Sequence, residues 1–379
     1  MGNELLQERL DLLKGAVRFE TPGRIPTSSN VWTWKILDSD KKAKIMEACL
    51  DLELMEEIVR EFHERYRFDM YEDLGTRNMF CVSDPLGDPG YVVNDELGSI
   101  NAPDLCLMED DEYDEIIADP VMFGWTKVFP RKFGSFTYEQ FRQAVKGFQR
   151  FGAYNVHIAK VFAEEYGVPR LKGSVHFSPV EDLFSWGLRG FKYFSRDMRR
   201  SADKVDAFID ANEPAMVAGA RAALETKDPS AVFDVYTVML AHSCMNAKQF
   251  DRFYYRSMKK LIDLTVEYNG MATFFCEDSF LRFKDFFQDV PKGYLDVTIE
   301  QDDLFQVREA CPTIALTGGL PSTLLGTGTP EECVDFAKSL VEGLGNGFIL
   351  GQSKMISFRK DCTRENLLAV QEYALNQKL

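Results

Sequence analysis

Apolar and polar positions repeat along the chain in a pattern that predicts alternating strands and helices from about residue 171 onwards. Short apolar runs at 272–275 (ATFF), 313–316 (TIAL) and 347–350 (GFIL) have the composition of strands that are covered on both faces. Between such runs, apolar residues recur at three- and four-residue spacing, as in 246–270, which ends at a glycine. Strands that alternate with helices indicate parallel pairing.

The number of strand–helix units favours a (β/α)8 barrel, the TIM-barrel form of the α/β class. Such a barrel takes about 250 residues, whereas this chain has 379. We expect the surplus in an N-terminal helical extension with the first strand (1–66) and in an irregular insertion (76–165), all within one domain, 1–379. The alternative is a doubly wound sheet, but the glycine-rich dinucleotide turn that such a sheet should carry after its first strand is missing.

The N-terminal half has a less regular pattern. Apolar periodicity predicts helices at 1–24 and 38–66, strand-like segments at 24–32 and 68–75, and two or three helices at 137–167. Further along, GTGTPEECV (326–334) is interpreted as a loop and a capping box, with Thr329 as N-cap and Glu332 at N3, rather than as a phosphate-binding loop.

In a (β/α)8 barrel the functional side chains follow the C-terminal ends of the strands. The densest reactive group predicted there is Cys276, Glu277 and Asp278. Thiolates and carboxylates bind zinc, and a carboxyl group can act as a general acid or base. The alternative is a buried cysteine before a solvated acid pair that begins the next helix, with Asp278 or Ser279 as its N-cap.

Other predicted strand ends carry further candidates, and one of these ends runs from Glu300 to Asp302. His242 and Cys244 are separated by one residue, so on an extended segment both would point to one side and could bind one zinc ion. Lys354 is a candidate anion-binding residue or is simply exposed, and Trp186 is expected to line a pocket or to pack. Three more residues complete the substrate-binding candidates: Asn30, Trp32 and His176.

Charge and cysteine usage exclude several classes of partner. The chain has 44 basic and 60 acidic residues, a net charge of −16, which argues against nucleic acid and against an anionic membrane surface. No apolar run is long enough to span a membrane. Eight scattered cysteines without a CxxC pair are typical of reduced thiols. We therefore expect a cytoplasmic protein.

Four segments resemble the uroporphyrinogen decarboxylase superfamily, and they occur in order along most of the chain. They are EYDEIIADP (112–120), GLRGFKYFSRDM (187–198), KQFDRFYYRSMKKLI (248–262) and the stretch 318–351. The resemblance implies a (β/α)8 barrel, in agreement with the periodicity. It also implies one of two activities: decarboxylation of a porphyrinogen without a cofactor, or methyl transfer to or from a corrinoid protein.

The corrinoid-dependent branch is the closer resemblance. Porphyrinogen decarboxylases of the family carry an arginine-rich N-terminal loop, but the matching stretch here (23–37) has no arginine after Arg24. In the corrinoid branch a zinc ion is held by a His-x-Cys pair and a later cysteine. By this resemblance Cys276 matches the cysteine of the pair, Phe274 stands in place of the histidine, and the later cysteine falls near Lys354.

Only one of these three zinc ligands, Cys276, is present, so zinc stays a candidate cofactor only with altered ligands. The resemblance would place it on Cys276 and Glu277, with His242 or Asp278 as a further ligand. The alternative is that no metal is bound.

The resemblance therefore implies a methyltransferase that moves a methyl group from a small methylated substrate, with an aryl methyl ether as a candidate, to a corrinoid carried by a partner protein. Glu277 or Asp278 would protonate the leaving group, or a metal would polarise it. One alternative is a lyase that decarboxylates a smaller carboxylate, which requires Lys354, Arg189 or Arg282 to point into a cationic pocket. Another is a non-catalytic scaffold with a filled pocket. A homodimer is compatible with the resemblance.

Overall fold

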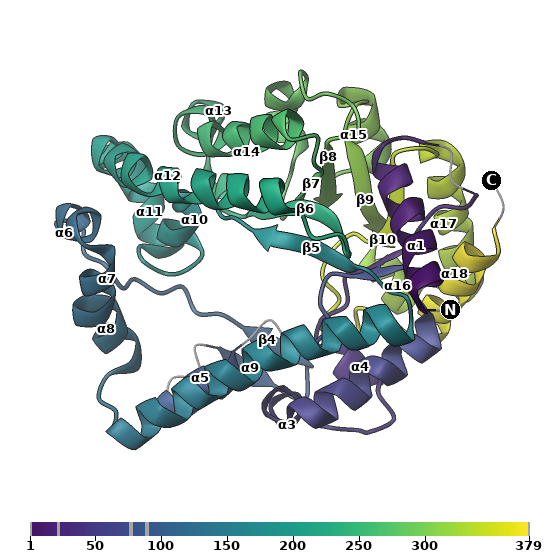
Figure 1. Ribbon diagram of the computed structural model, residues 1–379, viewed down its shortest axis with the longest axis horizontal. Helices are drawn as coiled ribbons and strands as arrows, with labels where there is room; N and C mark the ends of the chain where they lie inside the picture. Colours follow the sequence, from purple (N-terminus) through teal and green to yellow (C-terminus); the bar gives the residue numbers. More distant parts are fainter. Residues whose placement is uncertain (1, 21–22, 76–78, 88–90, 378–379) are drawn as a thin grey trace.

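The computed structural model describes residues 2–20, 23–75, 79–87 and 91–377 (Figure 1). Its centre is a parallel sheet of six strands in the order β10-β9-β8-β7-β6-β5. The strands are β5 (Arg170–Val175), β6 (Ala231–Met239), β7 (Ala272–Cys276), β8 (Leu295–Ile299), β9 (Ala315–Leu320) and β10 (Phe348–Gln352).

Two short strands complete a ring of eight parallel strands. β1 (Ser28–Ser29) pairs with β2 (Met70–Tyr71), and a parallel bridge from Thr27 to Leu350 joins this pair to β10. β2 contacts β5, but no ladder joins the two strands in the described part of the chain. The predicted (β/α)8 barrel is confirmed, and it has one unpaired seam, between β2 and β5.

Helices follow the strands and cover the outside of the barrel (Figure 1). In chain order they are α10 (Pro179–Phe184), α11 (Gly190–Arg200), α12 (Ala202–Thr226), α13 (Ala247–Gln249), the π-helix η4 (Phe250–Tyr255), α14 (Arg256–Glu267), the 3-10 helix η5 (Leu281–Phe287), α15 (Leu304–Ala310), α16 (Ser322–Thr327), α17 (Pro330–Leu344) and α18 (Arg364–Asn376). The predicted capping box at the start of α17 is confirmed, because Thr329 and Glu332 bond each other's backbone N–H groups. The segment after the acid pair Glu277 and Asp278 is the short 3-10 helix η5 and not an α-helix.

The N-terminal helix closes the end of the barrel at which the strands begin. α1 (Gly2–Val17) packs against β6, β9 and β10. Its buried side chains Leu10, Leu13, Ala16 and Val17 form one cluster with residues of the strands. Between β1 and β2 lie α2 (Trp34–Asp38), α3 (Ile45–Leu50) and α4 (Leu52–Tyr66). The single helix predicted at 38–66 is divided, because the Asp51 side chain caps α4.

The stretch between β2 and β5 contains several short elements and one long helix. They are α5 (Phe80–Ser83), the 3-10 helix η1 (Asp84–Leu86), the hairpin β3 (Val92–Asn94) with β4 (Ser99–Asn101), α6 (Tyr113–Ala118), α7 (Pro120–Phe123), the π-helix η2 (Gly124–Val128), α8 (Phe129–Phe133) and α9 (Tyr138–Glu165). Instead of two or three helices at 137–167 there is one, because a capping box at Thr137 starts α9 and no proline interrupts it. None of the described helices is long and apolar enough to cross a membrane.

Candidate functional site

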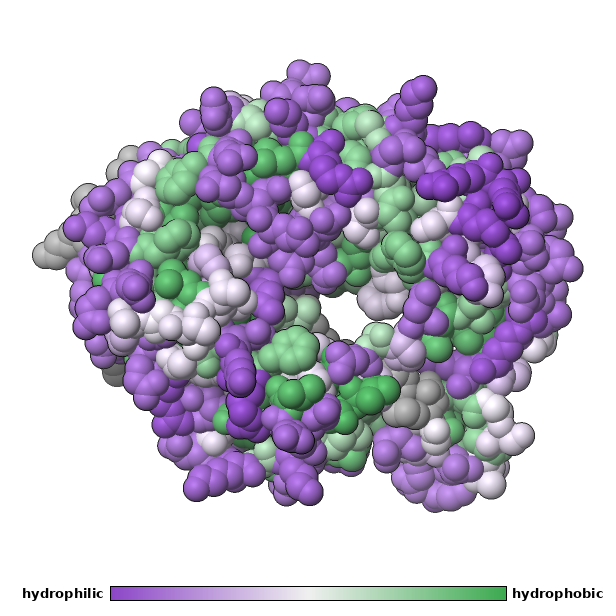
Figure 2. All heavy atoms as spheres, turned by 180° about the vertical axis from the view of Figure 1, so that it is seen from behind, coloured by the Kyte–Doolittle hydropathy of each residue, from purple (hydrophilic) through white to green (hydrophobic). Residues whose placement is uncertain are grey.

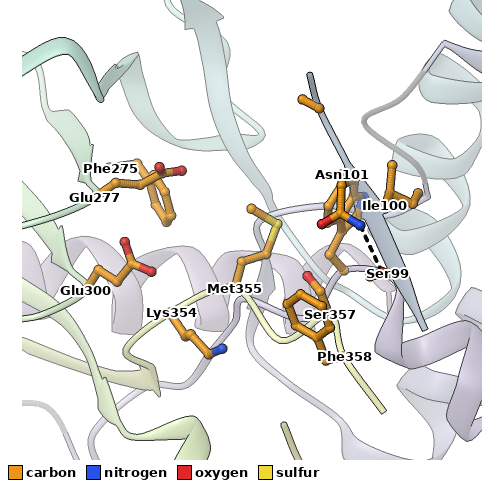
Figure 3. A pocket seen from close by; sticks show the side chains of 12 residues that line it. Ser99, Ile100, Asn101, Phe275, Glu277, Glu300, Lys354, Met355, Ser357 and Phe358 are labelled. Carbon is orange, nitrogen blue, oxygen red and sulfur yellow. Dashed lines mark hydrogen bonds between the residues drawn. The ribbon is translucent and has the colours of Figure 1, made fainter. Parts of the chain in front are cut away.

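A cavity of about 340 Å³ lies at the C-terminal ends of β7, β8 and β10 (Figure 3). This is the end of a (β/α)8 barrel where active sites are found. Strand ends contribute most of the lining, and the β3–β4 hairpin closes one side. The lining residues are Trp32, Ser99, Ile100, Asn101, Ala102, Phe275, Glu277, Glu300, Lys354, Met355, Ser357 and Phe358.

Two carboxylic acids face this cavity from neighbouring strands. Glu277 follows β7 and Glu300 follows β8, whose last residues Cys276 and Ile299 are partners in the parallel ladder. The two carboxyl groups point into the same space (Figure 3). Burial raises the pKa of Glu300; the positive charge of Lys354 opposes this shift and the negative charge of Asp278 adds to it. Glu300 therefore keeps its proton to a higher pH than an ordinary glutamic acid.

Lys354 lines the cavity but is already paired with a carboxylate. Its Nζ lies 3.0 Å from Asp361 Oδ1 and 5.7 Å from the centre of the Phe358 ring. Asp361 also accepts hydrogen bonds from the backbone N–H groups of Ser357 and Phe358. The charged side chains that line the cavity are thus two glutamic acids and one lysine that is already ion-paired.

Cys276 lies on the other face of β7. Neighbouring residues of a strand point to opposite sides, so Phe275 joins the barrel interior while Phe274 and Cys276 join the core beneath the helices. There the Cys276 sulfur lies 3.5 Å from His242 Nε2. Burial raises the pKa of the Cys276 thiol well above its usual range and lowers that of His242 to about 4, so both are neutral.

The structure does not bring Cys276, Glu277 and His242 together as a ligand set, because Glu277 faces the cavity from the opposite side of the strand. Among the described residues, no group of three or more His, Cys, Asp or Glu side chains is arranged to hold a metal ion. The spacing argument for Cys244 also fails, since it lies with His242 in the 3-10 turn η3 (Ala241–Cys244) and not on an extended segment. These residues do not fit a zinc site.

Asp278 is turned away from the cavity. Its backbone has a positive φ of 66°, and its Oδ2 lies 3.0 Å from Arg282 Nη1. Arg282 also donates to the carbonyl groups of Ser243 and Met245. Asp278 therefore holds the loop after β7, and the alternative in which it caps the next helix is wrong.

Asn30 and Trp32 lie at the end of β1, beside the cavity. The Asn30 N–H donates to Gln352 Oε1 at 2.7 Å. Within the described chain, however, no protein group pairs with either side-chain polar atom of Asn30, with Nε2 of Gln352 or with Nε1 of Trp32, although all are buried. Buried polar atoms of this kind normally have a partner, so this end of the barrel offers hydrogen bonds to a polar ligand or to water.

His176 and Trp186 lie outside this cavity. His176 directly follows β5, and its ring packs against Gly219 of α12, outside the barrel. Its Nε2 lies 2.9 Å from Ser174 Oγ. Trp186 is half exposed and meets Phe177 edge to face at 5.3 Å. Both aromatic rings line a second cavity, which His176 does not reach.

The second cavity occupies the seam between β2 and β5, beneath α9. It has a volume of about 710 Å³ and a largely apolar wall. At one point of the wall Lys172 Nζ lies 3.3 Å from Glu72 Oε1 and 3.6 Å from the centre of the Tyr236 ring. Val238 on its wall is the ladder partner of Phe275 in the first cavity, so the two cavities are neighbours.

Sequence reasoning missed part of the first cavity. Glu300 stood at a predicted strand end, and that position was the available signal for it. Met355 and Phe358 follow the last strand, beyond the predicted end of β10. The hairpin residues Ser99 and Asn101 carry no such signal, because the insertion is folded onto the barrel only in three dimensions.

Comparisons with known proteins agree with this architecture. A methyltransferase from Methanosarcina mazei has the same fold, with a TM-score of 0.61 and 15% sequence identity over 98% of this chain and 98% of that one. At this identity the likeness shows the fold alone. No match was found among curated proteins. Residues 185–365 match the model of the uroporphyrinogen decarboxylase (URO-D) family, the superfamily that segments within this range resemble.

Proposed function

We propose that this protein is a methyltransferase that passes a methyl group from a small methylated substrate to the cobalt of a corrinoid carried by a partner protein, with an aryl methyl ether as the leading substrate class. The family match and the fold it shares with a methyltransferase are compatible with this activity. The observation that carries the proposal is the pair Glu277 and Glu300, which face one cavity with aromatic walls.

The chemistry requires an acid at the leaving oxygen. An ether oxygen leaves poorly unless it is protonated as the carbon–oxygen bond breaks. Glu300, whose pKa is raised by burial, is the acid that would donate this proton, and Glu277 would orient the substrate oxygen. The corrinoid, when bound, supplies the nucleophile that takes the methyl group. The enzyme itself holds the substrate between Trp32, Phe275 and Phe358 and excludes water.

The rim of the cavity is compatible with a large partner. Phe358 is 41% exposed, and the cavity lies at the end of the barrel rather than within its closed interior. Because the expected cysteine, histidine and glutamate do not form a metal-binding set, no step of the proposed mechanism depends on zinc.

The lyase alternative is less well supported. It requires cations that point into the cavity, yet Arg189 is fully buried in an ion pair with Asp197. Arg282 pairs with Asp278, and Lys354 pairs with Asp361. A carboxylated substrate would meet two glutamic acids instead. The scaffold alternative requires a filled pocket, which disagrees with a cavity of about 340 Å³ and with the raised pKa of Glu300.

An optical assay tests the proposal. The purified protein is mixed with photoreduced cob(I)alamin and, separately, with methoxylated aromatics, methylamines, methanol or methyltetrahydrofolate, and the methylcobalamin spectrum is followed. We expect a spectrum that depends on a methoxylated aromatic donor. The variants Glu300→Gln and Glu277→Gln should lose the activity, whereas Glu309→Gln, on the exposed face of α15, should retain it. Absence of transfer from every donor, also with the native corrinoid protein, would reject the proposal.

A further inference from the structure

The second cavity has about twice the volume of the first. Its volume is about 710 Å³, against about 340 Å³ for the cavity that holds Glu277 and Glu300. Figure 2 shows hydrophobic residues along the lower edge of an opening in the molecule, on the side where α9 runs. A large apolar pocket with a few polar groups is the usual form of a small-molecule binding site. The methyl transfer proposed for the first cavity leaves this larger space without a function.

The second cavity lies between one face of α9 and one edge of β5. Phe151, Asn155, Ile158 and Ala159 line it from α9. They are spaced by four, three and one residues, so they share one face of the helix. In the described part of the chain β5 pairs with β6 alone, so the other edge of β5 borders the seam. The cavity is therefore walled by regular elements of the fold.

Aromatic rings form a large part of the wall. They belong to Tyr71, Phe151, Phe177, Trp186 and Tyr236. The ring of Trp186 meets Phe177 edge to face, and 49% of the Trp186 surface is exposed, so this ring is open to a further contact. Aromatic side chains pack favourably against another ring in offset or edge-to-face geometry. The wall is therefore suited to an aromatic ligand.

The charged side chains of the wall are already paired within the protein. The pairs are Lys172 with Glu72 at 3.3 Å, Arg170 with Asp228 at 2.6 Å, and Asp73 with Lys35 at 3.6 Å. A charged ligand in this apolar space would have to displace one of these partners or stay without a partner of its own. The wall therefore favours an uncharged ring over a carboxylate or an amine.

The two cavities meet at one pair of neighbouring residues. Val238 lines the second cavity, Phe275 lines the first, and the two are partners in the ladder of β6 and β7. Neighbouring strands lie only about 4.8 Å apart. A molecule with two linked aromatic rings is long enough to place one ring in each cavity.

We propose that the substrate is a two-ring aryl methyl ether, whose methoxylated ring lies in the first cavity and whose second, uncharged ring lies in the second cavity. This inference rests on the proposed methyl transfer, because it places the reacting ring beside Glu277 and Glu300. Phe151, Ala159 and Trp186 would then select the substrate by its remote ring. Binding energy from a remote, non-reacting part of a substrate helps to hold the reacting group in position.

Isothermal titration calorimetry of the full chain tests the second cavity without any methyl transfer. The probes are 4-methoxyphenol, with one ring, and 4-hydroxy-4′-methoxybiphenyl, with two. We expect the two-ring ether to bind at least about 10-fold more tightly, because it buries a further ring. An excess of the one-ring ether should displace it, since both ligands occupy the first cavity.

A matched pair of variants on α9 locates the second ring. Ala159→Trp narrows the second cavity and should remove the preference for the two-ring ether. Ala153→Trp makes the same change at an exposed position of α9 that lines neither cavity, and it should keep the preference. Val175→Trp, on the β5 side of the cavity, serves if Ala159→Trp does not fold, as judged by circular dichroism. In the optical assay Ala159→Trp should raise KM at least about 10-fold for the two-ring ether only.

Three results would overturn the inference. Equal affinity of the wild-type protein for the two ethers would leave the second cavity without a ring of the substrate. A two-ring ether that excess one-ring ether does not displace would occupy the second cavity as a separate molecule. Loss of the preference in Ala153→Trp as well as in Ala159→Trp would show that the effect is not specific to the cavity.

The two proposals fail in different ways. Methyl transfer without a preference for the two-ring ether rejects this inference and leaves the proposed function intact. Tight binding of the two-ring ether, with no methyl transfer from any donor, rejects the proposed function. In that case the second cavity remains assigned to an uncharged aromatic ring.

Discussion

The direction of individual side chains along β7 decides which of its residues can take part in chemistry. Glu277 and Phe275 point into the barrel, whereas Cys276 and Phe274 point towards the helices. Because side chains on a strand alternate with a period of two, a cluster that is dense in sequence is divided between two environments. The thiol and the carboxyl group of this cluster therefore do not act on one substrate.

A pH profile of methyl transfer tests the role of Glu300. The burial of its side chain raises its pKa, so the protonated form persists above the range of an ordinary glutamic acid and is lost as pH rises through the raised value. We expect the rate to fall on the alkaline side of this pKa. In Glu300→Gln the rate should be lower by about 10²-fold or more, and this alkaline limb should disappear. An unchanged limb in the variant would assign the acid to another group.

Substitution of Cys276 tests whether the thiol takes part. Cys276 is fully buried, and the pKa of its thiol is raised by burial. We expect Cys276→Ala to lower the free energy of unfolding by about 1 kcal/mol, since it leaves a small cavity, and to retain methyl transfer and metal content. The measurements are urea denaturation, the optical assay and metal analysis. Lost activity in a folded, equally stable variant would return the thiol to the mechanism.

At the scale of elements, one buried acid links three strands. Asp296 on β8 accepts hydrogen bonds from Thr273 of β7 at 2.7 Å and from Thr317 of β9 at 2.8 Å. Burial raises its pKa to about 7, and the two threonine hydrogen bonds oppose this shift. The group is therefore largely protonated in the fold at mildly acidic pH, while the unfolded chain has already lost the proton.

This difference predicts an unusual pH dependence of stability. Since the folded pKa is raised, the contribution of Asp296 is fully present below the unfolded pKa and declines as pH rises towards about 7. Between pH 5 and 7 the loss should be on the order of 2 kcal/mol. Urea denaturation across this range should show a decline in the wild type that Asp296→Asn removes. The exposed control Asp251→Asn should keep the wild-type profile.

Two glycines of α9 give a matched test of its packing. A Cβ at Gly147 would lie 1.9 Å from the carbonyl oxygen of Cys81, whereas a Cβ at Gly152 would meet nothing within 4 Å. We expect Gly147→Ala to destabilise the protein by about 2 kcal/mol or more through this clash. Gly152→Ala should stabilise it by about 0.5–1 kcal/mol through helix propensity. Thermal denaturation of both variants measures the difference, and equal effects would contradict the close approach of α9 to α5.

For the whole molecule, closure of the barrel depends on the N-terminal helix. Leu13 of α1 is fully buried in the cluster that fills the barrel where its strands begin, while Leu5 on the same helix is 37% exposed. We expect Leu13→Ala to cost about 3 kcal/mol of stability and Leu5→Ala less than about 1 kcal/mol. Guanidinium denaturation measures both. Similar costs for the two variants would mean that α1 does not close the barrel.

The order of strands and helices was determined by the sequence alone, because periodicity is a local property of neighbouring residues. The apolar runs at 272–275 and 347–350 lie in β7 and β10 as predicted, and the capping box at Thr329 starts α17. Their alternation was enough to predict a (β/α)8 barrel, and the strand ends it marked include Glu277 and Glu300. The resemblance of segments such as 248–262 to one superfamily is also a property of sequence.

Only the tertiary structure decided which of these residues meet. Which residues of β7 point into the barrel depends on how this strand is packed in the closed sheet. Its packing places Glu277 on the inside and Cys276 on the helix side. The turn that carries His242 is a 3-10 helix, where the sequence predicted an extended segment. The β3–β4 hairpin reaches the cavity through contacts between segments far apart in the chain. Such contacts depend on which surfaces are buried together, and no local pattern encodes them.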